Sequence, residues 1–137
     1  EVFDSDMVGQ PGYDYHLLQH FNEMGVSYIT KNTNANTITH YVPEQTPRLH
    51  DCIARLRRAF PGANITTRKV AVVSAIGSNM KLPGFLARAA AALAENGINV
   101  LALDQCMRQV NMQFIIEREH FDAAQIALHR RLVENEA

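Results

Sequence analysis

Gly9-Gln10-Pro11-Gly12-Tyr13 has a second copy later in the chain, Lys81-Leu82-Pro83-Gly84-Phe85. Each copy follows a run with the pattern of a strand and precedes a run with the pattern of a helix. A glycine and a β-branched residue, Gly25-Val26 and Gly97-Ile98, follow the two copies at equal distance. The offset is 72 residues in both cases, which indicates one structural unit present twice.

The repeat divides the chain into two expected domains, residues 1–68 and 69–137. In the first, apolar residues at helical spacing, β-branched runs and turn residues predict a regular order of elements. A helix is expected to start at Thr46-Pro47, because threonine is a good N-cap and proline suits the first helical position. The expected elements are strands at 2–3, 26–30, 37–42 and from 64, a turn at 32–36, and helices at 13–24 and 47–60.

The second unit repeats this order without its last strand. The expected elements are strands at 70–76, 98–103 and 110–117, and helices at 85–94 and 120–133. The strand at 70–76 is apolar or small on both faces, which predicts a central strand covered on both sides. Because no strand follows the last helix, a strand from upstream of this chain or from the first unit must fill the open edge, or the edge stays exposed.

The order strand, helix, strand, strand, helix, strand is the ferredoxin-like or split βαβ arrangement. We therefore expect an α+β fold of two ferredoxin-like βαββαβ units in tandem, each with an antiparallel sheet and its helices on one face. Units of about 70 residues bury little core alone, so they are expected to pack on each other or on a second copy of the chain. This layout serves RNA binding, metal carriage and small-molecule sensing, so the fold leaves the function open.

The composition is that of a globular protein, with 137 residues, 47% hydrophobic, 20% charged and a net charge of −1. The near-neutral charge gives no basic surface for nucleic acid or an anionic membrane. No apolar run reaches membrane-spanning length, and the acidic start at residues 1–6 is unlike a signal peptide. Cys52 and Cys106 lack metal-ligand spacing, so we expect free thiols and a cytoplasmic location. The chain has no initiator Met and starts inside an expected strand, which suggests a fragment of a longer protein.

RNA binding, metal binding and catalysis have little support in the residues. The strands lack the glycine-aromatic signature of RNA-binding sheets. His16 and His20 have ligand-compatible spacing on a helix, but they flank an apolar stripe and no third ligand is evident. Asp104 with Cys106 has no activating histidine, and no known catalytic motif occurs. We expect no metal site and no catalytic residue in this chain.

The repeated Pro-Gly turn lies where a strand passes into a helix. Backbone N–H groups are free at a helix start, and glycine lets a ligand approach the main chain, so a carboxylate is the natural ligand. Asp4 and Asp6, before the first turn, either cap a solvated loop or contact that ligand. Two such turns, each followed by a polar hairpin turn, favour an amino-acid sensor over a plain tight turn.

Longer stretches of the chain carry a resemblance to a known family. They are 33–41 (TNANTITHY), 69–77 (KVAVVSAIG), 83–85 (PGF), 92–100 (ALAENGINV) and 127–134 (ALHRRLVE). Over its whole length the chain resembles the paired ACT domains that form the C-terminal regulatory part of aspartokinases. The ordered pair of units makes this resemblance specific, since single ACT domains are degenerate.

The resemblance implies a regulatory function. Aspartokinases transfer the ATP γ-phosphate to the β-carboxylate of aspartate, on the route to lysine, threonine and methionine. Their kinase domain lies upstream, with a Lys-Phe-Gly-Gly-type start that this chain lacks. ATP and Mg are therefore expected only in that domain. We expect neither a cofactor nor kinase activity in this chain. In the family, ACT domains pair side by side across a homodimer, and end-product amino acids bind at the interfaces.

The resemblance also implies which residues contact the effector. In the first unit they are Asp4, Asp6, Met7, Val8, Gly9, Gly12, Tyr13, Ile29, Asn34 and Asn36. A possible second site comprises Asn79, Met80, Leu82, Gly84, Phe85 and Gln105. Main-chain amides would take the effector's carboxylate, and Asp and Asn oxygens would take its ammonium groups. We expect the first unit to hold the effector.

One departure from the family concerns the second strand. Lysine-sensing relatives tend to have an acid there, where this chain has Tyr28-Ile29-Thr30. Either Asp4 or Asp6 substitutes, or the effector is threonine, or there is none. The expected function is thus allosteric regulation of an aspartokinase by lysine or threonine. The alternatives are a structural dimerisation module of a feedback-insensitive enzyme and a stand-alone ferredoxin-like enzyme.

Overall fold

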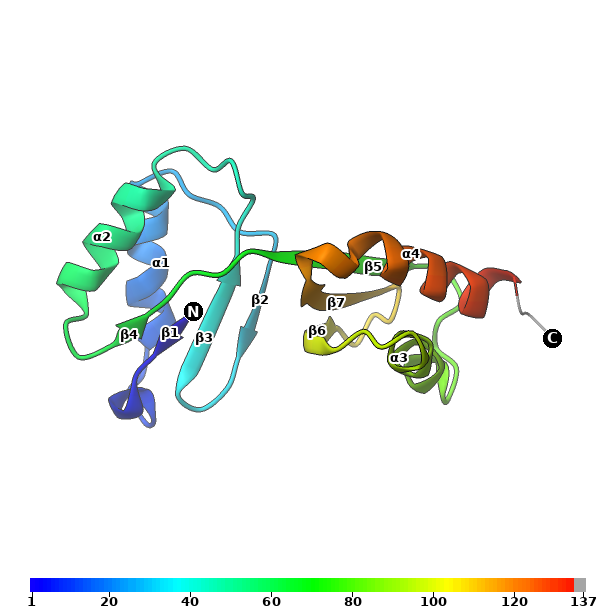
Figure 1. Ribbon diagram of the computed structural model, residues 1–137. Coiled ribbons are helices and arrows are strands. Elements are labelled where there is room, and N and C mark those ends of the chain that lie inside the picture. Colours follow the sequence, from blue (N-terminus) through cyan, green and yellow to red (C-terminus); the bar gives the residue numbers. More distant parts are fainter. Residues whose placement is uncertain (135–137) are drawn as a thin grey trace. The chain divides into compact units, whose positions relative to one another are not determined.

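The computed structural model describes residues 1–134 of the chain, which form two compact units, one of residues 1–68 and one starting at Lys69 (Figure 1). Each unit contains one antiparallel sheet and two α-helices. The predicted α+β fold, with ferredoxin-like units in tandem, is confirmed. Among the described residues, no helix is long and apolar enough to cross a membrane.

The first unit has the complete βαββαβ order. Its elements are β1 (Val2–Phe3), a 3₁₀ turn (Ser5–Met7), α1 (Tyr13–Glu23), β2 (Thr30–Thr33), β3 (Thr37–Tyr41), α2 (Leu49–Ala59) and β4 (Asn64–Ile65). The sheet order is β2-β3-β1-β4, with every neighbouring pair antiparallel. Consequently β2 is an edge strand, while β1 and β3 lie in the middle of the sheet.

The core of the first unit lies between this sheet and its two helices. On α1, Tyr13, Leu17 and Phe21 are buried at intervals of four residues, the spacing of one helix face. They pack with the paired strand residues Val2 and Ile38, which also belong to the core. Residues two positions from Ile38 on β3 therefore face the helices as well, which fixes the orientation of His40.

Two predicted boundaries in the first unit are wrong. The strand expected at 26–30 is instead β2 at Thr30–Thr33, because the hairpin turn is shorter than expected. The Asn34 side-chain oxygen accepts from the backbone N–H of Asn36 at 3.3 Å and of Thr37 at 3.1 Å, which closes the turn at residues 34–36. Pairing then runs outward from Thr33 opposite Ile38, so the strand extends through Asn32.

The start of the second helix was also predicted wrongly. Helix α2 begins at Leu49, with Arg48 at its N-cap in the left-handed conformation (φ 62°). The Thr46 hydroxyl donates a hydrogen bond to the carbonyl of Pro43 at 2.6 Å, so it does not cap the helix. The helix therefore starts after the Thr-Pro pair instead of at it.

The second unit has three strands within residues 69–134, in agreement with the prediction that it lacks a closing strand of its own. Its elements are β5 (Val70–Ile76), α3 (Phe85–Glu95), β6 (Val100–Gln105), β7 (Asn111–Glu117), a 3₁₀ turn (Arg118–His120), α4 (Phe121–His129) and a π-helical turn (Arg130–Glu134). The order is β5-β7-β6, so the prediction that β5 is a central strand is wrong. The central strand is β7, where Met112, Phe114, Ile115 and Ile116 are all buried, whereas Ile76 at the end of β5 is 78% exposed.

Candidate functional site

The predicted effector loop of the first unit connects β1 to α1 and closes against the β2–β3 hairpin. The backbone N–H of Asp4 donates to the carbonyl of Asn36 at 3.0 Å. Gly12 adopts φ 75°, which turns the chain from the loop into α1, and its carbonyl accepts the first intrahelical bond from His16 at 3.1 Å. The N–H groups of residues 13–15 precede that first bond, so they are the donors that a helix start offers to an anion.

Asp4 organises this loop from inside. Its Oδ2 accepts a hydrogen bond from the Tyr13 hydroxyl at 2.6 Å, and its Oδ1 accepts from the Asp6 N–H at 2.9 Å. The Tyr13 hydrogen bond, aided by the Asp6 N–H, lowers the pKa of the Asp4 carboxyl. Burial of Tyr13, together with the Asp4 bond, raises the pKa of its phenol. Since both Asp4 oxygens are engaged, Asp6 is the exposed acid of the loop.

The structure brings together most, but not all, of the residues predicted for the first site. Met7 and Tyr13 are buried, while Asp6, Val8, Gly9 and Gly12 are exposed around them. Asn34 and Asn36 lie in the hairpin turn beside the loop, where their side-chain oxygens accept bonds within the turn. Ile29 lies at the opposite end of the hairpin, where its N–H donates to Tyr41 at 2.7 Å.

The second unit builds its loop in the same way. The N–H of Gly77 donates to the carbonyl of Val110 in the β6–β7 turn at 3.0 Å, and Met80 is buried beneath the loop. Gly84 (φ 83°) precedes α3 as Gly12 precedes α1. The remaining predicted residues lie around this turn: Asn79 and Leu82 are exposed, Phe85 begins α3 under the Arg88 guanidinium (5.9 Å), and Gln105 ends β6.

Three polar residues of the first unit that the sequence reasoning missed form a cluster between α1 and the hairpin. Asp14 on α1 is ion-paired with Lys31 on β2, and its Oδ1 lies 3.2 Å from Nε2 of His40 on β3. The side chains of His40, Asp14 and Lys31 are 5%, 23% and 35% exposed. Strand alternation was the available signal, since Ile38 predicts an inward-facing His40 and pairing aligns Lys31 with it.

The surroundings of His40 disfavour its charged form. Its ring lies 4.8 Å from the ring of Phe21 and 5.3 Å from that of Tyr28. Burial lowers the pKa of His40, and the carboxylate of Asp14 only partly offsets this. The hydrogen bond to Asp14 raises the pKa of Lys31, so Lys31 keeps its charge at neutral pH.

The depressed pKa of His40 predicts acid sensitivity of the first unit. The unfolded histidine titrates near 6.5, above its folded pKa, so the unfolded state binds more protons as the pH falls below about 6.5. We expect the free energy of unfolding to fall over that range by at most about 1.4 kcal/mol per pH unit for one proton. Urea titrations at several pH values should show a flatter profile for His40→Phe. The exposed His50, replaced by Gln, is the control, and an unchanged slope in His40→Phe contradicts the prediction.

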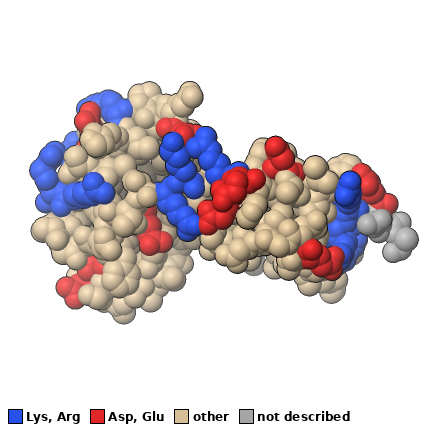
Figure 2. Space-filling view, in the orientation of Figure 1, with Lys and Arg blue, Asp and Glu red and all other residues tan. Residues whose placement is uncertain are grey.

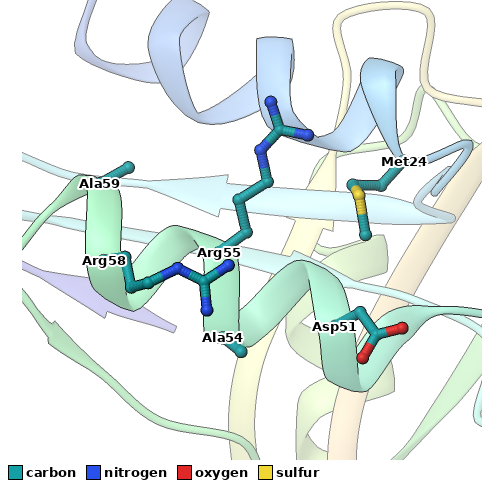
Figure 3. Close-up of a pocket in the computed structure, with 6 residues that line it drawn as sticks. All are labelled: Met24, Asp51, Ala54, Arg55, Arg58 and Ala59. Carbon is teal, nitrogen blue, oxygen red and sulfur yellow. The ribbon is translucent and has the colours of Figure 1, made fainter.

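A shallow hollow of about 690 Å³ lies on the outer face of α2 (Figure 3). It is lined by Met24, Asp51, Ala54, Arg55, Arg58 and Ala59. Arg55 extends towards α1, where it is ion-paired with Glu23. Figure 2 shows basic side chains gathered on this side of the unit. The hollow is open to solvent, where single charges bind weakly, so the loop remains the better candidate.

Neither thiol nor metal chemistry emerges from the described residues. Cys52 is buried and Cys106 exposed, both as free thiols, as predicted. Within residues 1–134, no group of three His, Cys, Asp or Glu side chains is placed to hold a metal ion. His16 contacts Gln19 at 3.3 Å, while the His20 ring packs against Phe60 at 5.9 Å. The two histidines of the sequence pair thus have separate surroundings.

Comparison with known proteins identifies the family. The ACT domain family matches residues 73–132. The aspartate kinase Ask_Ect of Stutzerimonas stutzeri (strain A1501) is 40% identical over 136 residues, which is 99% of this chain. The chain spans 29% of that protein's length.

Solved structures share the fold over nearly the whole chain. Aspartate kinase from Clostridium acetobutylicum superposes with a TM-score of 0.85 at 16% identity, covering 98% of this chain and 32% of that one. The regulatory subunit of aspartate kinase from Thermus flavus gives 0.81 at 20% identity, covering 95% and 88%. These structures show the shared fold, and the 40% identity to Ask_Ect with the ACT match at residues 73–132 shows that the chain belongs to the ACT-domain regulatory regions of aspartate kinases.

Proposed function

We propose that this chain is the effector-binding part of an aspartate kinase, and that it binds an end-product amino acid, lysine or threonine. The observation that carries the proposal is the first-unit loop, held against the hairpin and ending in the free N–H groups at the start of α1. Such a helix start accepts a carboxylate, and the exposed Asp6 beside it offers an acceptor for an ammonium group. An α-amino acid carries both groups.

The proposal includes a homodimer through the ACT units in the cytoplasm, and a kinase domain elsewhere in the same protein. Large apolar side chains are exposed near both loops: Val8 (61%), Ile76 (78%), Leu82 (50%) and Met107 (96%). Such residues favour contact with another protein surface. ATP and Mg would bind in the kinase domain, which would phosphorylate aspartate in lysine, threonine and methionine biosynthesis. The effector would favour one quaternary arrangement of the dimer because it binds that arrangement more tightly than the other.

A structural dimerisation module without effector response is the second candidate. It is favoured by Asp14, whose carboxylate occupies the first turn of α1, where it opposes the carboxylate of an effector. The absence of an acid at Tyr28-Ile29-Thr30 also disfavours lysine as an effector, because its side-chain ammonium would lack a partner there. The two candidates differ in one measurable property, binding of an amino acid.

Thermal unfolding with lysine, threonine or methionine separates the two candidates. A ligand that binds only the folded state stabilises it by about 2.7 kcal/mol at 100 times its Kd. We therefore expect the midpoint of unfolding to rise by several degrees with lysine or threonine. Glycine, which shares the carboxylate and ammonium groups without the side chain, is the matched control. If none of the amino acids changes the midpoint up to millimolar concentration, the sensor function is wrong for this chain.

A further inference from the structure

The polar cluster of Asp14, Lys31 and His40 has an apolar counterpart in the second unit. At the repeat offset of 72, Asp14 corresponds to Leu86 and Lys31 to Leu103. Lys31 pairs with His40 across the first hairpin, and Leu103 pairs with Phe114 across the second. Phe114 lies in the core of its unit, and Leu86 packs against that core. The fold itself therefore does not require polar side chains at these three positions.

Placing charged groups at such positions has a cost. Removing ions from water is unfavourable, and apolar residues of similar volume are often equally or more stabilising. His40 is 5% exposed and Asp14 23% exposed, so both have lost most of their solvent. Buried positions normally hold apolar side chains, as they do in the second unit. Polar groups at the equivalent positions of the first unit therefore point to a functional role.

Two buried polar atoms of the cluster lack a hydrogen-bond partner. Nε2 of His40 and Oδ1 of Asp14 are both shielded from solvent, lie 3.2 Å apart, and make no hydrogen bond of good geometry. A proton on His40 Nε2 supplies a donor to Asp14 Oδ1, and the ring carries a positive charge as well once Nδ1 is also protonated. No larger group is needed to satisfy both.

Groups on each element packed against His40 affect how readily its ring is protonated. Burial disfavours the charged ring most, Asp14 on α1 favours it, and Lys31 on β2 and the amino group of Glu1 oppose it. Tyr28, before β2, places its ring against the imidazole, and Phe21 on α1 covers another side. The carboxylate of Asp14 is thus shared between a permanent cation, Lys31, and a titratable one, His40.

Asp14 connects the cluster to the predicted effector loop. It follows Gly12 and Tyr13 directly and belongs to the first turn of α1, the turn that offers free N–H groups. Added positive charge at Asp14 makes the helix start more favourable for an anion. A proton on His40 therefore acts on the donors that would hold an effector's carboxylate.

We propose that His40 is a proton-linked regulator of the first unit, which through Asp14 makes amino-acid binding at the start of α1 pH-dependent. This inference rests on the proposed function. Binding tightens by about threefold or more as the pH falls through the midpoint at which His40 is protonated in the folded chain, the effect of one nearby charge in a partly screened setting.

Two experiments on the 137-residue chain test this coupling. In the first, NMR follows the His40 ring and the amides of Gly12 and Tyr13 through a pH titration without any amino acid. We expect the two amides to shift with the same midpoint as the His40 ring. Amides that do not follow the ring overturn the proposal.

In the second experiment, calorimetry measures lysine and threonine binding at pH 7.5 and at a pH below the His40 midpoint that the NMR titration gives. The wild type should bind more tightly at the lower pH, and His40→Phe, which copies the second unit, should lose that difference. His40→Gln is the second variant if His40→Phe does not fold, and His50→Gln is the control. Binding that is present but pH-independent in the wild type overturns this inference alone. Absence of binding at both pH values removes the proposed function, and this inference with it.

Discussion

Replacing Phe114 with alanine is expected to lower the free energy of unfolding of the second unit by about 3–5 kcal/mol, the usual cost of removing a fully buried aromatic side chain. Phe114 has no exposed surface and lies on the central strand β7, between Val73 on β5 and Leu103 on β6. Its removal leaves a cavity next to both neighbouring strands. A unit of this size has a total stability of only about 5–15 kcal/mol, so the variant is expected to populate the unfolded state measurably.

Urea unfolding followed by amide signals from each unit tests this expectation. The transition of the second unit should move to lower urea, while amides of the first unit such as Leu17 and Ile38 report whether that unit unfolds separately. Leu103→Ala is the matched control, because Leu103 is the cross-strand partner of Phe114 but is 44% exposed. We expect it to cost less than about 1 kcal/mol. Equal losses in the two variants would show that β7 is not the centre of the core.

The order of elements could be predicted from the sequence, but the positions of strands in the sheets could not. Alternation and helical spacing are local signals, and they placed α1, α3 and β7 close to where they lie. Whether β5 lies at the edge or in the centre of the sheet depends on which strands pair with it. That pairing joins residues far apart in the sequence. Residues 70–76 are apolar or small on both faces, yet β7 is the central strand because β5 and β6 pair with it, one on each side.

The polar cluster was missed for a related reason. Asp14 is a good residue for a helix start, Lys31 is ordinary in an edge strand, and His40 is common in a hairpin, so none is unusual alone. Only the pairing of Lys31 with His40 and the reach of Asp14 from α1 bring them together. The residues of the loop, in contrast, follow one another in the chain, which made them visible as a motif.

Which loop holds the effector is a question that one pair of substitutions resolves. Gly12 and Gly84 both have positive φ, at 75° and 83°, and both precede the first residue of a helix. Valine does not adopt this conformation without strain, which costs about 1–2 kcal/mol. The backbone must then rotate, and the N–H groups at the helix start no longer point at a bound carboxylate.

We expect Gly12→Val to weaken lysine or threonine binding by about tenfold or more, the loss that accompanies misplacement of a charge-assisted hydrogen bond. Gly84→Val should leave that binding nearly unchanged if the first unit holds the effector. Calorimetry gives the affinities, and urea unfolding shows that both variants are folded. Gly62→Ala, at an open position with ordinary φ, is the control for a general effect of substitution. The reverse result, with loss only in Gly84→Val, would assign the effector to the second unit, where Leu86 replaces Asp14 and no acid stands in the first turn of the helix.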